Sequence, residues 1–241
     1  DERKSSVPHY RPEEIMKATS GVVIRSGRRK NLGGVSIDSR TLRPGMIFVP
    51  VVGERHDAHT FIDQSLELGA SAIVGEKKRI QPEILEKANG RWVFAVGDTT
   101  RALGDLAAFH RNRFKLPLIA ITGSSGKTTV KEMCAAILAR RGNVLATNGN
   151  FNNDIGVPLT LLRLEPHHEY AVMELGANHL GEIAYTTNLV KPDVATIVNA
   201  AASHLEGFGN LLGVARAKSE IFKGLDKDGV AIVNVDSQFA E

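Results

Sequence analysis

The residues with the clearest chemical meaning form one short run, Thr122-Gly123-Ser124-Ser125-Gly126-Lys127-Thr128-Thr129. The run follows the apolar segment LIAIT and opens the helix-like segment VKEMCAAILARR. Glycines allow a tight turn whose N–H groups point at phosphate oxygens, and a helix start adds roughly half a positive charge. This order predicts a nucleotide-binding loop. Gly123–Thr129 would surround the phosphates, with Lys127 reaching the β- and γ-phosphates and the Thr128 hydroxyl lying on Mg²⁺.

The loop is shorter than the standard phosphate-binding motif. The spacing G-x-x-x-x-G-K-[ST] would need a glycine at position 121, where this chain has Ile121. We therefore interpret it as the shorter form G-x-x-G-K-T-T. The alternative is a glycine turn that carries Lys-Thr by chance, and the flanking strand and helix argue against it.

Two polar residues follow later strands of the same region. Glu174 ends the segment YAVME, and His204 lies in the loop NAAASHLEGFG after a further apolar strand. In an open parallel sheet, ligands bind at the carboxyl ends of the strands. Glu174 is therefore a candidate Mg²⁺ ligand, directly or through water, with a plain surface glutamate as the alternative. The residues alone leave open whether His204 is a ligand or a structural histidine.

A third segment at this edge, GNFNNDIGVP, contains Asn150, Asn152 and Asn153. Asparagines here could cap a helix or turn the chain, or their amides could recognise a sugar or peptide. Other nucleotide enzymes are not favoured. A switch GTPase needs N-K-x-D after a strand, which Asn234–Asp236 does not supply, and we find no arginine-rich lid of the kind that small-molecule kinases carry.

The composition favours a cytoplasmic globular protein. Of 241 residues, 42% are hydrophobic and 24% charged, and the apolar runs are too short to span a membrane. We see no signal peptide in the polar N-terminus, and the single cysteine, Cys134, fits a reducing compartment. The net charge is +3, and the basic run Arg25–Lys30 lacks interleaved aromatics, so we interpret it as a solvated loop rather than a nucleic-acid site.

The periodicity of apolar residues predicts two α/β domains. We expect a small mixed α/β N-terminal domain over residues 1–98, and a P-loop domain over residues 99–241 with a mostly parallel sheet flanked by helices. Because the sequence stops just after a strand, we expect this second sheet to be incomplete. The predicted strands are Val35–Asp38, Met46–Val52, Ser71–Val74, Trp92–Val96, Leu118–Thr122, Asn143–Thr147, Tyr170–Leu175, Val194–Asn199 and Val230–Val235. The predicted helices are Pro12–Thr19, Thr60–Leu68, Pro82–Ala88, Thr99–Phe114, Lys127–Arg141, Pro158–Leu164, Gly181–Leu189 and Val214–Leu225.

Several segments together resemble the Mur ligase family, in particular its members that add D-alanyl-D-alanine to UDP-N-acetylmuramoyl-tripeptide. The matching segments are TGSSGKTT, GNFNNDIGVPLTLL, MELGANHLGEIA, NAAASHLEGFG, ARAKSEIF, and the Asp38-Ser39-Arg40 motif with PGMIFVPVVGERHDAHTFI. Sister ligases that add lysine or diaminopimelate have a serine-rich segment in place of ELGANH. The resemblance extends over nearly the whole of residues 12–236.

The resemblance implies roles for particular residues. ATP would lie on the phosphate loop, Thr128 and Glu174 would share one Mg²⁺, and His204 would bind a second. Lys218 matches the lysine that this family carbamylates to support the second metal. Ser39 and Arg40 match positions that contact the uridine diphosphate, so residues 1–98 would form the uridine-nucleotide-binding domain. Asn150, Asn152 and Asn153 fall in the loop that faces the muramoyl peptide.

The resemblance also implies a mechanism and a length. The γ-phosphoryl group is transferred to the peptide carboxylate, and the D-alanyl-D-alanine amine attacks the acyl phosphate, releasing ADP and phosphate. The family's C-terminal domain has no counterpart here, so we expect a truncated chain with little ligase activity of its own. Separately, we expect a monomer. The alternatives are another ligase of the Mur and folylpolyglutamate superfamily, or a non-catalytic nucleotide-binding fragment.

Overall fold

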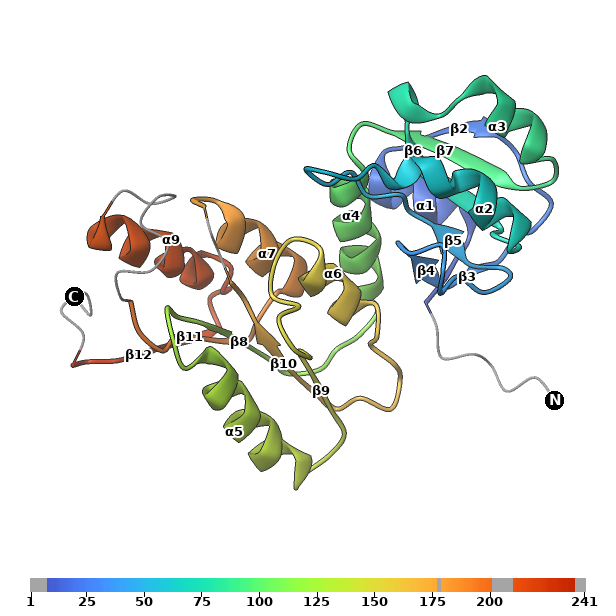
Figure 1. The fold of residues 1–241 in the computed structure, drawn as a ribbon. Helices are drawn as coiled ribbons and strands as arrows, with labels where there is room; N and C mark the ends of the chain where they lie inside the picture. Colours follow the sequence, from blue (N-terminus) through green and yellow to red (C-terminus); the bar gives the residue numbers. More distant parts are fainter. Residues whose placement is uncertain (1–7, 177–178, 201–209, 237–241) are drawn as a thin grey trace. The chain divides into compact units, whose positions relative to one another are not determined.

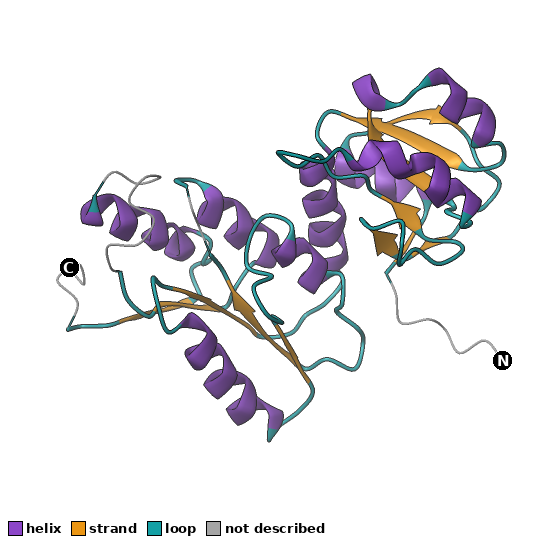
Figure 2. Cartoon of the chain, in the orientation of Figure 1, coloured by secondary structure: helices purple, strands orange, loops and turns teal. Residues whose placement is uncertain are grey.

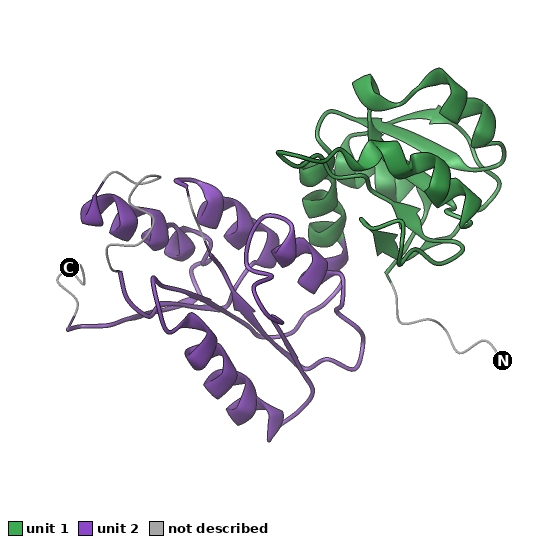
Figure 3. Cartoon of the chain, in the orientation of Figure 1, with its two compact units in different colours: residues 1–109 green, residues 110–241 purple. Residues whose placement is uncertain are grey.

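A computed structural model gives the fold and describes residues 8–176, 179–200 and 210–236 (Figures 1 and 2). The chain forms two compact units, residues 1–109 and 110–241 (Figure 3). The division lies inside helix α4 (Thr99–Arg111) rather than before it, where the sequence placed the boundary. Most of α4 belongs to the first unit because its apolar face is buried there: Leu103 and Leu106 are fully buried, and the Tyr10 hydroxyl donates to the Leu106 carbonyl at 2.6 Å.

The first unit is built on a sheet that is five-stranded in the described residues, with order β2-β7-β6-β5-β4. Strands β4 to β7 are mutually parallel, and β2 joins β7 antiparallel at one edge. A separate antiparallel pair joins β1 to β3. The strands are β1 (His9–Tyr10), β2 (Val22–Arg25), β3 (Leu32–Gly33), β4 (Val35–Ser36), β5 (Ile47–Phe48), β6 (Ala72–Glu76) and β7 (Trp92–Val96).

Short helices connect these strands and enclose the core of the unit. They are α1 (Pro12–Thr19), α2 (Ile62–Glu67), α3 (Pro82–Lys87), and the 3₁₀ turns η1 (Ala58–Phe61) and η2 (Lys77–Arg79). The core joins Phe48, Ile73 and Val93 of the sheet to Ile62 and Leu66 of α2. Apolar burial of this kind is the main stabilising force for a unit of this size.

The second unit contains a parallel sheet, five-stranded in the described residues, with order β12-β11-β8-β10-β9. The central strand β8 (Leu118–Thr122) lies between β10 (Tyr170–Glu174) and β11 (Val194–Ile197). Strands β9 (Val144–Ala146) and β12 (Val230–Val233) are at the edges. The carboxyl ends of β8, β10 and β11 therefore meet at one edge, which is where an open parallel sheet binds ligands.

Helices cover both faces of this sheet, as the alternating pattern predicted. In Figure 1, α5 (Lys127–Ala139) lies on one face, and α6 (Gly156–Leu161), α7 (Glu182–Val190) and α9 (Leu211–Lys223) lie on the other. The predicted α/β class and the mostly parallel sheet are confirmed. The sequence missed β1, β2 and β3, and it extended β5 beyond its observed end at Phe48. None of the helices described is long and apolar enough to cross a membrane.

Candidate functional site

The phosphate loop joins β8 directly to α5, as predicted. Gly126 is the N-cap of α5 with φ of +79°, in the left-handed region that favours glycine. The Lys127 ammonium folds back over the loop and donates to the Gly123 carbonyl at 2.8 Å. A lysine above the N-terminus of a helix concentrates positive charge where phosphates bind.

Asn199, which follows β11, holds the loop in place. Its Oδ1 accepts from the backbone N–H groups of Ser124 and Ser125 at 2.9 and 3.0 Å, and its Nδ2 donates to the carbonyl and hydroxyl oxygens of Ser125, both at 3.0 Å. The N–H groups of Ser124 and Ser125 are thus engaged within the protein. The N–H groups in the first turn of α5, at Lys127, Thr128 and Thr129, have no acceptor within the helix and are the ones oriented for phosphate.

Thr128 and Glu174 lie together at the ends of adjacent elements. Glu174 ends β10 opposite Ile121 of β8, and the Thr128 hydroxyl donates to its two carboxylate oxygens at 3.3 and 3.4 Å. Cis ligands in an octahedral Mg²⁺ site are about 3 Å apart, since each lies about 2.1 Å from the ion. Two oxygens at this separation, with a carboxylate only 3% exposed, fit one hard divalent cation.

The structure places a buried lysine, Lys131, beside this carboxylate, and the sequence motifs did not predict it. Lys131 of α5 is 2% exposed; its ammonium donates to the Thr147 carbonyl at 2.7 Å and lies 3.9 Å from Glu174 Oε2. The Thr147 hydroxyl accepts from the Glu174 backbone N–H at 2.9 Å. The only available signal was the spacing of Lys131 four residues after Lys127, which puts both on one side of a helix. No local sequence pattern indicated that Thr147 would contact Lys131 and Glu174.

Lys218 of α9 lies in the interior of the second unit, with 1% of its surface exposed. Burial, and to a smaller extent the positive charge of Lys127, lower the pKa of its ammonium to about 8. Helix α9 packs against β11 and β8, and β8 leads directly into the phosphate loop. The predicted second ligand, His204, lies outside the described residues. Among the described residues, no group of three or more His, Cys, Asp or Glu side chains could hold a metal ion.

The three candidate asparagines have different environments. The Asn153 side chain stabilises the turn that leads into α6, because its Oδ1 accepts from the N–H groups of Ile155 and Gly156 at 3.1 and 2.7 Å. The Asn152 carbonyl accepts from the Gly176 N–H at 2.8 Å, which ties the loop to the end of β10. Asn150 has an exposed side chain. For Asn153 the turn-forming alternative is thus observed, while a role towards substrate remains a prediction for all three.

Ser39 and Arg40 follow β4 in the first unit. The Ser39 hydroxyl is buried and donates to Gln64 Oε1 at 3.1 Å. The Arg40 guanidinium is exposed and contacts both carboxylate oxygens of Asp38, with Nη2 at 2.8 Å from Oδ2. Hydrogen bonds from Arg40 lower the pKa of Asp38. Contact of Ser39 and Arg40 with a uridine nucleotide stays a prediction.

Family models match both units of the chain. The Mur ligase middle domain matches residues 121–241, and the catalytic domain of the Mur ligase family matches residues 31–111. The UDP-N-acetylmuramoyl-tripeptide–D-alanyl-D-alanine ligase of Escherichia coli is 53% identical over 208 residues, which are 86% of this chain and 44% of that protein. The Bacillus subtilis ligase of the same name is 40% identical over 199 residues, or 83% of this chain and 42% of that protein. The chain thus spans less than half the length of these relatives.

Solved structures share the fold. A crystal structure of MurF from Acinetobacter baumannii has a TM-score of 0.89 and 41% identity, covering 98% of this chain and 51% of that one. MurF ligase from Thermotoga maritima in complex with ADP has a TM-score of 0.75 and 34% identity, covering 84% of this chain and 45% of that one. The matched domains and the loop geometry lead to the same conclusion: the chain belongs to the Mur ligase family.

Proposed function

We propose that this chain carries the nucleotide-binding machinery of an ADP-forming ligase that joins D-alanyl-D-alanine to UDP-N-acetylmuramoyl-tripeptide in the cytoplasm. The observation that carries the proposal is the Thr128 hydroxyl at 3.3 Å from the Glu174 carboxylate, beside a phosphate loop at the start of α5. Relatives that share 40–53% of their aligned residues with this chain bear the name of that ligase. Mg-ATP is the cofactor that fits this loop and this oxygen pair.

The residues present suit the first step of such a reaction. An amine does not form an amide with a free carboxylate at a useful rate, because hydroxide would have to be the leaving group. Phosphorylation of the carboxylate provides phosphate as a better leaving group. Bringing the γ-phosphate to a carboxylate joins two anions, so the site must offset negative charge. Lys127 and the N–H groups of Lys127–Thr129 do so from preorganised positions. Mg²⁺, when held by Thr128 and Glu174, supplies further charge neutralisation.

A second metal would depend on His204 and Lys218. The Lys218 nitrogen would add to the carbon of CO₂ and lose a proton, giving a carbamate with negatively charged oxygen ligands. Burial of Lys218 and its proximity to the charge of Lys127 support this assignment, because both disfavour the ammonium form that cannot react.

Substrate contacts complete the proposal. Ser39 and Arg40 in the first unit would bind the uridine diphosphate. Asn150, Asn152 and Asn153 would face the muramoyl peptide from the loop before α6. We further propose a monomer, in line with the family.

Two measurements test the proposal. Calorimetry with Mg-ADP on this chain should give saturable binding that weakens at least about tenfold in Lys127→Ala, because a charge-assisted contact to phosphate is lost. Lys115→Ala, which removes an exposed lysine before β8, is the matched control and should bind normally. Absence of Mg-ADP binding would refute the nucleotide site.

Phosphate release with ATP and UDP-N-acetylmuramoyl-tripeptide, with and without D-alanyl-D-alanine, tests the reaction. Release that depends on the dipeptide supports the ligase. Binding of nucleotide without any release supports the alternative of a non-catalytic nucleotide-binding chain. Release with glutamate in place of the dipeptide would instead indicate a polyglutamylating ligase.

A further inference from the structure

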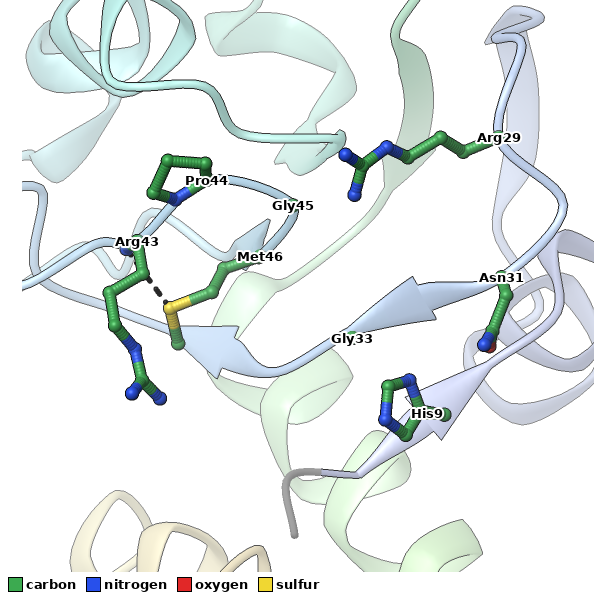
Figure 4. A pocket seen from close by; sticks show the side chains of 8 residues that line it. All are labelled: His9, Arg29, Asn31, Gly33, Arg43, Pro44, Gly45 and Met46. Carbon is green, nitrogen blue, oxygen red and sulfur yellow. Dashed lines mark hydrogen bonds between the residues drawn. The ribbon is translucent and has the colours of Figure 1, made fainter. Parts of the chain in front are cut away.

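The basic run Arg25–Lys30, which the proposed function leaves without a role, borders a hollow in the first unit. The hollow has a volume of about 420 Å³ and lies before the first residues of β4 and β5 (Figure 4). Ser39 and Arg40, in contrast, follow the carboxyl end of β4. The hollow is therefore at the opposite edge of the sheet from the proposed uridine contacts.

The basic run is held in position rather than left as a free loop. The Trp92 indole N–H donates to the Arg29 carbonyl at 2.7 Å, and the Arg28 N–H donates to the Gly90 carbonyl at 3.0 Å. Gly27 packs so closely on Trp92 that an added Cβ would lie 2.5 Å from its ring. The backbone that carries the Arg29 side chain is thus preorganised.

Hydrogen-bond donors surround the hollow. Figure 4 shows Arg29 extending across it towards Gly45, with Arg43 and Met46 on the other side and His9 and Asn31 from a third direction. No carboxylate is among the lining residues. Within the part of the chain that the structure describes, the guanidinium groups of Arg29 and Arg43 take part in no ion pair or hydrogen bond.

The glycine beneath Arg29 lets the guanidinium approach the backbone. Gly45 has φ of +89°, and a Cβ built there would lie 2.5 Å from Arg29 Nη1. Pro44 and Met46 add an apolar side to the hollow. Guanidinium groups that lack an internal acid partner, beside an apolar surface, form the donor set that proteins use for phosphorylated ligands.

We propose that this hollow binds a small phosphorylated molecule through Arg29 and Arg43, with the Asn31 amide as a further hydrogen-bonding group. A volume of 420 Å³ falls within the range of small-molecule sites, which is about 300–1,000 Å³. The inference does not depend on the ligase proposal, because it uses only residues at this edge of the first unit.

Trp92 provides a built-in reporter, since it is the single tryptophan of the chain and its indole N–H bonds the Arg29 carbonyl. Its indole signal would be followed in ¹H–¹⁵N spectra during titration with inorganic phosphate and then pyrophosphate, at constant ionic strength. We expect a saturable shift, with affinity reduced at least about fivefold in Arg29→Ala and in Arg43→Ala. Arg29→Lys, which keeps the charge but loses the planar fork, should lose part of the affinity.

Lys30→Ala is the matched control, because it removes an adjacent exposed charge that does not line the hollow. It should change the affinity by less than about twofold, since a solvated charge is largely screened. An equal loss in Lys30→Ala, or a shift that never saturates, overturns the proposal in favour of non-specific attraction.

Two further experiments distinguish this hollow from the phosphate loop and from a site for lipid headgroups. Lys127→Ala should leave the Trp92 titration unchanged, so failure at this hollow and failure of the nucleotide site are distinguishable. Sedimentation with phosphatidylglycerol vesicles should leave the protein in the supernatant. Arg29-dependent sedimentation would show that the hollow binds lipid headgroups at a membrane surface and would overturn the assignment to a small molecule.

Discussion

The carboxamide of Asn199 and the backbone of Ser125 hold each other from both sides: Oδ1 accepts from the Ser125 N–H at 3.0 Å while Nδ2 donates to the Ser125 carbonyl at 3.0 Å. This side chain mimics a neighbouring β-strand and fixes the loop that follows β8. The arrangement leaves the first turn of α5 to bind phosphate. Under the proposed function, Asn199 is therefore a positioning residue for the phosphate loop.

Asn199→Ala should weaken binding of Mg-ADP by about tenfold or more, equivalent to about 1.4 kcal/mol, because the loop loses the hydrogen bonds from the Asn199 side chain that fix its conformation. Calorimetry measures the affinity, and urea unfolding should show a loss of about 0.5–1.5 kcal/mol, because the side-chain hydrogen bonds to Ser124 and Ser125 are removed. Asn188→Ala, at an exposed position of α7, serves as control. Normal nucleotide binding by Asn199→Ala would show that the hydrogen bonds from the Asn199 side chain are not needed for nucleotide binding.

Lys131→Met should destabilise the second unit. Its ammonium offsets the buried charge of Glu174 and bonds the Thr147 carbonyl, so removal leaves both without their buried cation. We expect a loss of about 2–3 kcal/mol in the free energy of unfolding. Lys223→Met, at an exposed lysine of α9, should change it by less than about 0.5 kcal/mol. Equal stability of the two variants would contradict this role.

Acidification should destabilise the protein through His110. Burial lowers the pKa of His110, and the nearby Arg113 charge lowers it further, while the bond to the Leu164 carbonyl at 2.8 Å opposes the shift. A lowered folded-state pKa means that the full stability is present above the unfolded value of 6.5 and is lost as the pH falls below it.

His110→Gln should remove part of the loss of stability below pH 6.5, whereas the control His56→Gln, at an exposed histidine, should retain it. Urea unfolding at each pH gives the comparison. His168 also has a lowered pKa, from burial and then from His167, so some dependence should persist in His110→Gln. Identical pH profiles of unfolding free energy for the wild type and His110→Gln would exclude His110 as a source of the acid destabilisation.

Lys218 should form a carbamate. In ¹³C-bicarbonate at about pH 8, where the amine is partly neutral, a carbamate carbon signal should appear in the NMR spectrum. Lys218→Ala should lack the signal, and Lys223→Ala should keep it. Persistence of the signal in Lys218→Ala would place the modification elsewhere.

Strands and helices of the second unit followed from the sequence because each is several residues long and has a regular apolar period. Strand β10, for example, is buried over Ala171–Glu174, and its apolar run is easily recognised. Strand β2 was missed because it is a short edge strand, with Val22 64% exposed and Ile24 38% exposed. Its three apolar residues, 22–24, are too few to show the period that separates a strand from a loop, and its antiparallel pairing with β7 has no local signal.

Local sequence was sufficient to place the glycine loop between β8 and α5, and Glu174 at the end of β10, because both positions are features of neighbouring residues. Tertiary structure alone identified Asn199 and Lys131. Asn199 lies 74 residues from Ser125, and Lys131 lies 16 residues from Thr147. No local pattern predicts which side chain will meet which backbone group once parallel strands align. Sheet order, set by burial of apolar faces across the whole unit, decided those contacts.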